Sequence, residues 1–352
     1  MKQRLDYIDL AKGLGIMSIV LGHIGTWLWS FHLPIFFIIT GFLISHTKEN
    51  NRPFNQIIPQ KINTLIKPYL LFSICFLGID FIKFKFISEF TFTELLNNTY
   101  LTISFFGIAQ LWFLPCLFFA EILFITLVKK QGIKSGIIIS LLAFTSIIIS
   151  LAIQNDIFQS TTIYILIHYF LISVLRIVYA CFFIYIGYFA KEKFGRFFVN
   201  PLRKKFYFPV FIMLLLCILA KEFIHINDFR IALFGGNGAE AIFYLATSIL
   251  GTLSLILFCK ILGQLKITPL KKLLAFYGKN SLLVLCTHLY LPFIPITKLV
   301  LNTLTSEKLK PLVFNLSVFI IIMVLEVFII IGINKFIPAM AGRSMKKISV
   351  HF

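Results

Sequence analysis

Residues 4–41 read RLDYIDLAKGLGIMSIVLGHIGTWLWSFHLPIFFIITG and place several ionisable side chains in and around a long apolar run. An ionisable group at the centre of a bilayer costs about 3 kcal/mol or more, so it is a functional candidate by default. The candidates in this stretch are Arg4, Asp6, Asp9, Lys12, His23 and His32. We expect the rest of the chain to form a helical bundle around these groups.

The composition excludes a soluble domain. The chain has 352 residues, of which 59% are hydrophobic and 13% charged, whereas soluble domains carry about 25% charged residues. The net charge of +19 does not indicate nucleic-acid binding, because the basic residues form short clusters between apolar runs, as in membrane loops. The first apolar run has no small-residue cleavage site, so we expect no secretory signal.

Six cysteines lie in or beside apolar runs and form no C-x-x-C pair. We therefore expect buried thiols, with neither a disulfide nor a metal site.

Ten apolar segments are candidate membrane spans, since a spanning helix needs about 20 apolar residues. They are predicted at about residues 10–29, 34–45, 69–84, 111–128, 133–153, 163–190, 206–220, 241–262, 273–296 and 312–333. The sequence thus predicts an all-α, polytopic bundle of about ten spans, formed by residues 1–352 as one integral-membrane domain.

The distribution of basic residues predicts the orientation. With the N-terminus inside, 24 Lys and Arg residues fall in inner segments and 7 in outer segments. Because inner loops carry the excess of Lys and Arg, we expect both termini to be cytoplasmic, which requires an even number of spans.

Lys12 and His23 are eleven residues apart, which is three helical turns plus about 20°. They should share one helix face, about 16 Å apart along the axis, with Lys12 near the inner surface and His23 beyond mid-depth. Asp9 precedes Lys12 by three residues and can pair with it. The alternative interpretation makes Asp9 and Lys12 interfacial anchors and His23 a packing residue.

Two further histidines are predicted in the outer half. His32 comes just before Pro34, and proline disfavours helix before it and suits the first turn of the next helix. We therefore expect His32 at a tight outer turn near His23. In the ninth predicted span, Ser281 and His288 should share a face. The three histidines are then expected to form one polar site, with purely structural histidines as the alternative.

Four other side chains inside predicted spans need an explanation. Glu121 and Arg176 are charged, and such residues are usually turned inward and paired; we weigh a structural ion pair equally against a role in substrate binding. Trp112 is expected at the outer interface, where aromatic belts are common. Glu326 has no partner that the sequence identifies.

Four motifs of this chain resemble the acyltransferase-3 family of integral-membrane acyltransferases, in particular a branch similar to fucose 4-O-acetylases. The motifs are R-x4-D-x2-KG-x9-H from Arg4, FH-x-P-x-FF-x3-G from Phe31, LWFL from Leu111 and G-x2-S-x6-H from Gly278. The last motif departs from the family pattern, which often has tyrosines where Leu282 and Leu283 stand.

The resemblance implies transfer of an acyl group, usually acetyl from cytoplasmic acetyl-CoA, to a hydroxyl of a glycan or lipid-linked sugar at the bacterial inner membrane. His23 would be the general base or a transient acyl carrier. His32 would assist it, and Arg4 and Lys12 would hold the CoA phosphates. Substrate-binding or supporting roles would fall to Asp9, Trp112, Glu121, Arg176, Ser281 and His288.

The sequence predicts no permanently bound cofactor and no metal: acetyl-CoA or another acyl-CoA is the donor substrate. The partners are the glycan acceptor and membrane lipid, while self-association and contacts with proteins of polysaccharide assembly stay open. Two other classes compete: a transporter or flippase of lipid-linked glycan, and a non-catalytic assembly partner. The acceptor, the choice of acetyl or succinyl, and the side on which acylation occurs are also open.

Overall fold

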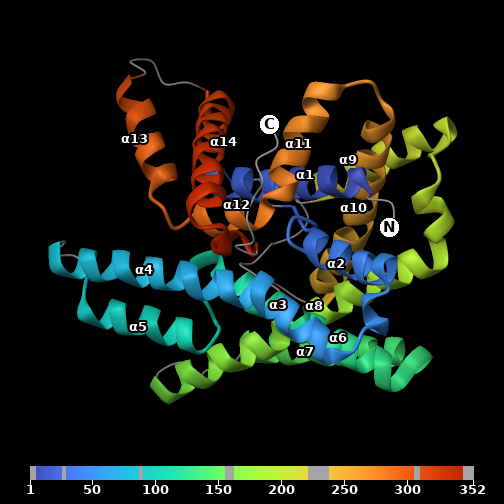
Figure 1. The fold of residues 1–352 in the computed structure, drawn as a ribbon, viewed down its shortest axis with the longest axis horizontal. Coiled ribbons are helices and arrows are strands. Elements are labelled where there is room, and N and C mark those ends of the chain that lie inside the picture. Colours follow the sequence, from blue (N-terminus) through green and yellow to red (C-terminus); the bar gives the residue numbers. More distant parts are fainter. Residues whose placement is uncertain are drawn as a thin grey trace. The chain divides into compact units, whose positions relative to one another are not determined.

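The computed structural model describes residues 5–25, 29–86, 90–154, 162–220, 238–304 and 310–343. Within these residues every regular element is a helix, so the predicted all-α class is confirmed (Figure 1). The chain divides into two compact units. Unit 1 comprises Met1–Pro53 and Phe119–Ser281, and unit 2 comprises Phe54–Phe118 and Leu282–Phe352.

Within the described residues, unit 1 is built mainly from seven α-helices. These are α1 (Asp6–Ile24), α2 (Pro34–Thr47), α7 (Ser135–Gln154), α8 (Thr162–Val199), α9 (Tyr207–Leu219), α10 (Gly238–Gln264) and α11 (Thr268–Lys279). Helix α6 (Phe113–Gln131) passes from unit 2 into unit 1 after Phe118. The main packing partners in unit 1 are α2 with α8, α1 with α11, α7 with α8, and α10 with α9 and α1.

Unit 2 begins with α3 (Phe54–Lys61), which continues through the π-helical turn Ile62–Ile66 into α4 (Lys67–Phe86). Helix α5 (Phe92–Ile103) packs along α4, and the 3-10 helix η3 (Ala109–Trp112) follows (Figure 1). The second part of the unit contains α12 (Ser281–Thr287), α13 (Phe293–Leu304), α14 (Pro311–Phe336) and the 3-10 helix η7 (Pro338–Ala341).

Six helices among the described residues are long and apolar enough to cross a membrane. They are Asp6–Ile24, Phe54–Phe86, Ala109–Gln131, Tyr169–Val199, Ala239–Gln264 and Pro311–Phe336. Shorter apolar helices occupy Pro34–Thr47, Ser135–Ser150 and Phe293–Leu304. The chain is therefore a multi-pass membrane protein, while the count of ten spans and the cytoplasmic termini stay predictions.

Two pairs of glycines bring helix backbones into direct contact in unit 1. A Cβ atom on Gly13 would stand 2.1 Å from the carbonyl oxygen of Leu274, and one on Gly278 would stand 1.8 Å from that of Asp9. Helices α1 and α11 therefore meet through glycine from both sides. Between lipid-embedded helices, such small residues allow the close packing that drives association.

The same arrangement joins α2 to α8. A Cβ on Gly41 would stand 1.8 Å from the oxygen of Ile184, and one on Gly187 would stand 1.8 Å from that of Ile38. We call these two close contacts the α1–α11 seam and the α2–α8 seam. Each has glycine on both of its helices, so neither helix can carry a side chain at the point of contact.

The ninth predicted span, one continuous helix over residues 273–296, is a wrong prediction. The structure replaces it with α11, α12 and α13. The first break is at Asn280, whose Nδ2 donates to the oxygen of Phe276 at 2.8 Å. The second lies between Thr287 and Phe293, where Pro292 lacks the N–H that a helix interior needs. Ser281 and His288 consequently do not lie along one long membrane-spanning axis.

The structure adds one helix and corrects one prediction. The segment between the predicted spans at 69–84 and 111–128 contains α5. The hydroxyl of Thr91 accepts from the backbone N–H of Glu94, whose carboxylate accepts in return from the N–H of Thr91. In addition, Cys75 is exposed, while the other five cysteines are buried free thiols.

We expect Gly278→Ala to lower the free energy of unfolding by about 1–3 kcal/mol, since overpacking a close contact costs about that much. Gly332→Ala in α14 is the matched control, because nothing lies within 4 Å of its added methyl group. The free energy of unfolding of both variants is measured in mixed micelles. Equal stability of the two would contradict the close approach of α1 and α11.

Candidate active site

Helix α1 carries the line of residues from Asp9 to His23. The helix runs unbroken over Asp6–Ile24, so Lys12 and His23 lie on one helix with a rise of about 16 Å between them. Lys12 and Asp9 are half-buried, and His23 is exposed near the C-terminal end. Arg4 lies outside the described residues.

His32 lies in the turn that joins α1 to α2, as predicted from Pro34, which occupies the first position of α2. Helix α10 holds this turn from the side. The hydroxyl of Ser248 donates to the carbonyl oxygen of Ser30 at 2.8 Å. Gly251 leaves room for the ring of Phe31, which lies 2.3 Å from where a Cβ would be.

The His32 ring is 6% exposed and is hydrogen-bonded through Nδ1 to the carbonyl oxygen of Trp29. A carbonyl can only accept, so Nδ1 carries the proton and Nε2 of the neutral ring is the basic nitrogen. Burial lowers the pKa of His32 to about 4, against the opposing effect of the bond to Trp29. The charge of His23 lowers the pKa of His32 further, so the two rings lie within electrostatic range.

Glu121 and Arg176 are buried charges of unit 1. Glu121 on α6 is 3% exposed and Arg176 on α8 is 1% exposed. Their predicted ion pair stays a prediction.

Lys260 is a buried cation that the sequence analysis counted only as an inner-segment charge. Helix α10 extends to Gln264, so Lys260 lies within it, 5% exposed. Its Nζ donates to the carbonyl oxygen of Phe197 and lies 5.9 Å from the ring centroid of Tyr7 on α1. The N-terminal half of α1, which bears Lys12, therefore has a second cation near it.

Three of the predicted site residues lie outside the main part of unit 1: Ser281 is its last residue, and Trp112 and His288 belong to unit 2. Ser281 is the first residue of α12 and ends unit 1, whereas His288 follows α12 in unit 2. Trp112 ends η3 and is 6% exposed, and its place at the outer interface stays a prediction. That His288 shares a site with His23 and His32 stays a prediction, because those two lie in unit 1.

The ring of His288 is fully buried, and its Nδ1 lies 2.7 Å from the carbonyl oxygen of Val284. Its proton is therefore on Nδ1, as in His32, and Nε2 is again the basic nitrogen. Among the described residues, no group of three or more histidine, cysteine or acidic side chains is placed to hold a metal ion.

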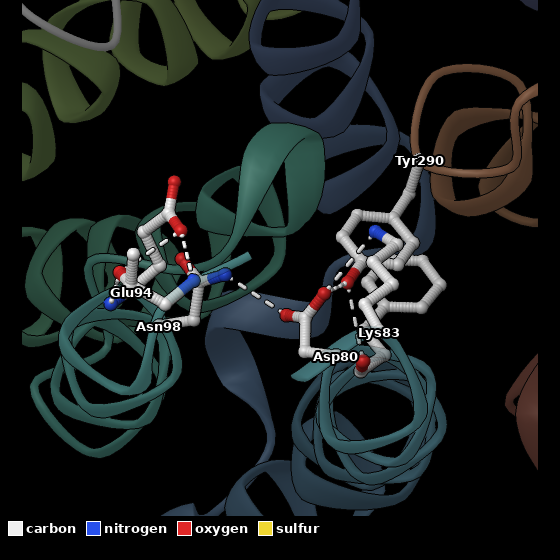
Figure 2. A network of polar contacts seen from close by, with 7 residues as sticks. Asp80, Lys83, Glu94, Asn98 and Tyr290 are labelled. Atoms are coloured by element: carbon white, nitrogen blue, oxygen red, sulfur yellow. Dashed lines mark hydrogen bonds and ion pairs between the residues drawn. The ribbon is translucent and has the colours of Figure 1, made fainter. Parts of the chain in front are cut away.

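Two acidic side chains form polar contacts within unit 2. The sequence analysis missed Asp80, and it identified no partner for Glu326. Glu326 on α14 accepts from the hydroxyl of Thr287 at 2.7 Å. Asp80 on α4, within a predicted span, binds Tyr290, Asn98 and Lys83 (Figure 2). The available signal for Asp80 was a carboxylate inside an apolar run.

Residues 5–333 match the family model described as an acyltransferase domain. The chain therefore belongs to the acyltransferase-3 family, and it is a membrane acyltransferase. No curated protein and no solved structure shows significant similarity to it.

We expect His32 to stay neutral from pH 8 down to about pH 5, because a pKa of about 4 means that it gains a proton only in more acidic solution. Nitrogen-15 histidine spectra, with the signal assigned by loss in His32→Gln, should show a constant Nδ1–H tautomer over this range. Titration of that signal near pH 6.5 would contradict the burial of the ring.

Proposed function

We propose that the protein transfers an acyl group, acetyl in the first instance, from acyl-CoA to a hydroxyl of a cell-envelope or extracellular glycan or its lipid-linked precursor. The observation that carries the proposal is the pair of His23 and the buried, neutral His32 in a chain of the acyltransferase-3 family. The proposed location is the inner membrane of a bacterium.

The chemistry needs a base near a hydroxyl, because a sugar hydroxyl is a poor nucleophile at neutral pH. In our proposal Nε2 of His23 takes the hydroxyl proton as the hydroxyl oxygen bonds to the thioester carbonyl carbon. The carbon–sulfur bond then breaks, and the CoA thiolate recovers the proton from His23. The products are the ester and free CoA.

His32 orients the acceptor in this scheme. A neutral imidazole costs less to bury than a permanent charge, and a fixed Nδ1–H tautomer leaves Nε2 to accept a hydrogen bond from a sugar hydroxyl. His288 has the same kind of nitrogen in unit 2, and we propose a supporting role for it. The contacts by which α10 holds the turn of His32 support the role of His32, since a base and its substrate must be held in register.

Lys12 and Arg4 bind the CoA phosphates in this proposal, because ammonium and guanidinium groups are the usual phosphate ligands of proteins. The rise of about 16 Å between Lys12 and His23 along α1 matches a donor that enters extended, with its phosphates at one end and its thioester at the other. Glu121 and Arg176 have supporting roles.

We expect His23→Ala and His32→Ala each to abolish glycan acylation, with membrane insertion unchanged. His46→Ala, a half-buried histidine near the end of α2, is the matched control and should retain wild-type activity. The measurement is base-labile acetyl in surface glycans of a deletion strain complemented with each variant. Full activity of His23→Ala would refute its assignment as the base.

The binding of CoA phosphates can be tested with a truncated donor. We expect Lys12→Gln to raise KM for acetyl-CoA about tenfold, the loss of about 1.4 kcal/mol, and to leave the rate with acetylpantetheine, which lacks the nucleotide phosphates, unchanged. Lys193→Gln, an exposed lysine of α8, serves as the control. An equal loss with both donors would show that Lys12 does not act on the phosphates.

A transporter of lipid-linked glycan is the other class left open by the sequence. Proteoliposomes with labelled acetyl-CoA and the glycan fraction of a deletion strain distinguish the two classes. Labelled ester and free CoA support the acyltransferase reaction, whereas movement of unmodified glycan with no release of CoA would support the transporter.

A further inference from the structure

The connection between α8 and α9 in unit 1 is basic and exposed. Residues 196–205 contain four basic residues and no acidic residue. All four are exposed in the structure, and we call them the basic surface: Arg196, Arg203, Lys204 and Lys205. The ordinary interpretation of such a run is a solvated loop, which has few contacts with the rest of its fold.

The backbone that carries the basic surface is instead bonded to α1 and α10. The buried ammonium group of Lys260 on α10 donates to the carbonyl oxygen of Phe197. The hydroxyl of Tyr7 on α1 donates to the carbonyl oxygen of Phe198 at 3.1 Å. Two other helices of the same unit therefore hold the end of α8 in place.

The connection also folds back on itself. The ring of Phe206 meets that of Phe197 edge to face, with centroids 5.6 Å apart. Leu202 is 5% exposed and belongs to one apolar cluster with Ile261 of α10. The end of α8 and the 3-10 helix η5 (Lys204–Phe206) therefore lie side by side, and their cations belong to one fixed surface.

The basic surface lies at the ends of two candidate membrane spans. One span, Tyr169–Val199, ends within the connection, and the other is Ala239–Gln264. The side-chain amide of Gln264 lies 2.9 Å from the hydroxyl of Tyr207, so the second span ends beside the connection. The distribution of Lys and Arg predicts this side to be cytoplasmic. We therefore expect the basic surface at the boundary of the inner leaflet with water.

Exposed phenylalanine rings adjoin the cations. Phe194, two residues before Arg196, is 58% exposed, and Phe208, three residues after Lys205, is 73% exposed. At a membrane boundary such rings leave water for the acyl chains, whereas ammonium and guanidinium groups stay at the headgroups. Cations beside exposed rings match a lipid, which offers a phosphate and apolar chains together, better than they match a free phosphate.

The positive charge of the basic surface is not neutralised by the described part of the chain. None of its four cations forms an ion pair with a described residue. The nearest carboxylate in the sequence, Glu192, accepts a hydrogen bond from the hydroxyl of Ser45 on α2 at 2.6 Å. Like charges held close together repel one another, so the surface is complementary to anions.

We infer that the basic surface binds anionic phospholipid of the inner leaflet, with the headgroup phosphate on Arg203, Lys204 and Lys205 and the acyl chains beside Phe208. Guanidinium and ammonium groups are the usual phosphate ligands of proteins. Clusters of about four to eight basic residues directly cytoplasmic of a membrane helix are typical of anionic-lipid sites. The inference is independent of the proposed acyl transfer, because the bound lipid stays unmodified.

The test measures binding of fluorescent phosphatidylglycerol to the purified full-length protein in neutral detergent micelles, by anisotropy. We expect unlabelled phosphatidylglycerol to displace the probe about tenfold better than phosphatidylcholine, whose headgroup has no net charge. Glycerol 3-phosphate at the same concentrations should not displace it. Displacement by glycerol 3-phosphate as good as by the lipid would show a phosphate site and overturn the inference.

The combined variant Arg203→Gln, Lys204→Gln and Lys205→Gln should raise Kd for phosphatidylglycerol about tenfold, a loss of about 1.4 kcal/mol. The matched control removes three exposed lysines from other predicted inner segments: Lys48→Gln, Lys130→Gln and Lys134→Gln. The control loses the same net charge and should keep its Kd within about twofold. Equal losses in the two variants would show a response to net charge alone and would overturn the inference.

Salt and the neighbouring ring provide a second arm. Raising NaCl from about 0.1 M to about 1 M shortens the Debye length from about 10 Å to about 3 Å, so it should weaken binding more in the wild type than in the combined variant. Phe208→Ser should also weaken binding. Phe170→Ser, which changes a 65% exposed ring near the other end of α8, should not.

The wild-type protein decides the matter even if the combined variant does not fold. Equal displacement by phosphatidylglycerol and phosphatidylcholine, with no effect of salt, would show that the connection is an ordinary solvated loop and would overturn the inference.

Discussion

The close approach of helix backbones through glycine is the constraint on which unit 1 depends. A side chain on Gly278 would reach the backbone of Asp9, and one on Gly187 would reach that of Ile38. Lipid offers no hydrophobic driving force between helices, so packing at such seams holds them together. Lys12 immediately precedes Gly13 and points about 100° away from the α1–α11 seam. The seam thus fixes the helix that carries Lys12 and His23 without covering the charged face.

A second regularity is the hydrogen bonding of two buried histidine rings. In each unit a histidine ring donates through Nδ1 to a backbone carbonyl within four residues: His32 to Trp29 and His288 to Val284. Where water is absent every polar group must find a protein partner. Local carbonyl acceptors at turns and helix ends satisfy Nδ1 of both rings, and each leaves Nε2 as the basic nitrogen. Chemistry that needs a neutral imidazole base is thereby compatible with deep burial.

Much of the fold follows from patterns that are local in the chain. The apolar runs predicted the long helices, and Pro34 predicted the turn that holds His32, because both signals act over a few residues. The capping box of Thr91 and Glu94, which marks the start of α5, is a local signal of the same kind that the sequence analysis missed. The ninth span was mispredicted because hydropathy is continuous across residues 281–287, whereas the breaks depend on the side chain of Asn280 and on Pro292.

The sequence by itself determined that this is a helical membrane protein of the acyltransferase-3 family, because hydropathy and motif spacing are properties of the linear chain. Only the tertiary structure decided which groups meet. Asp80 and Tyr290 are 210 positions apart, and Thr287 and Glu326 are 39 apart. Helical periodicity relates residues within a few turns, whereas contacts over such separations depend on how whole helices pack. These contacts therefore became visible only in the folded chain.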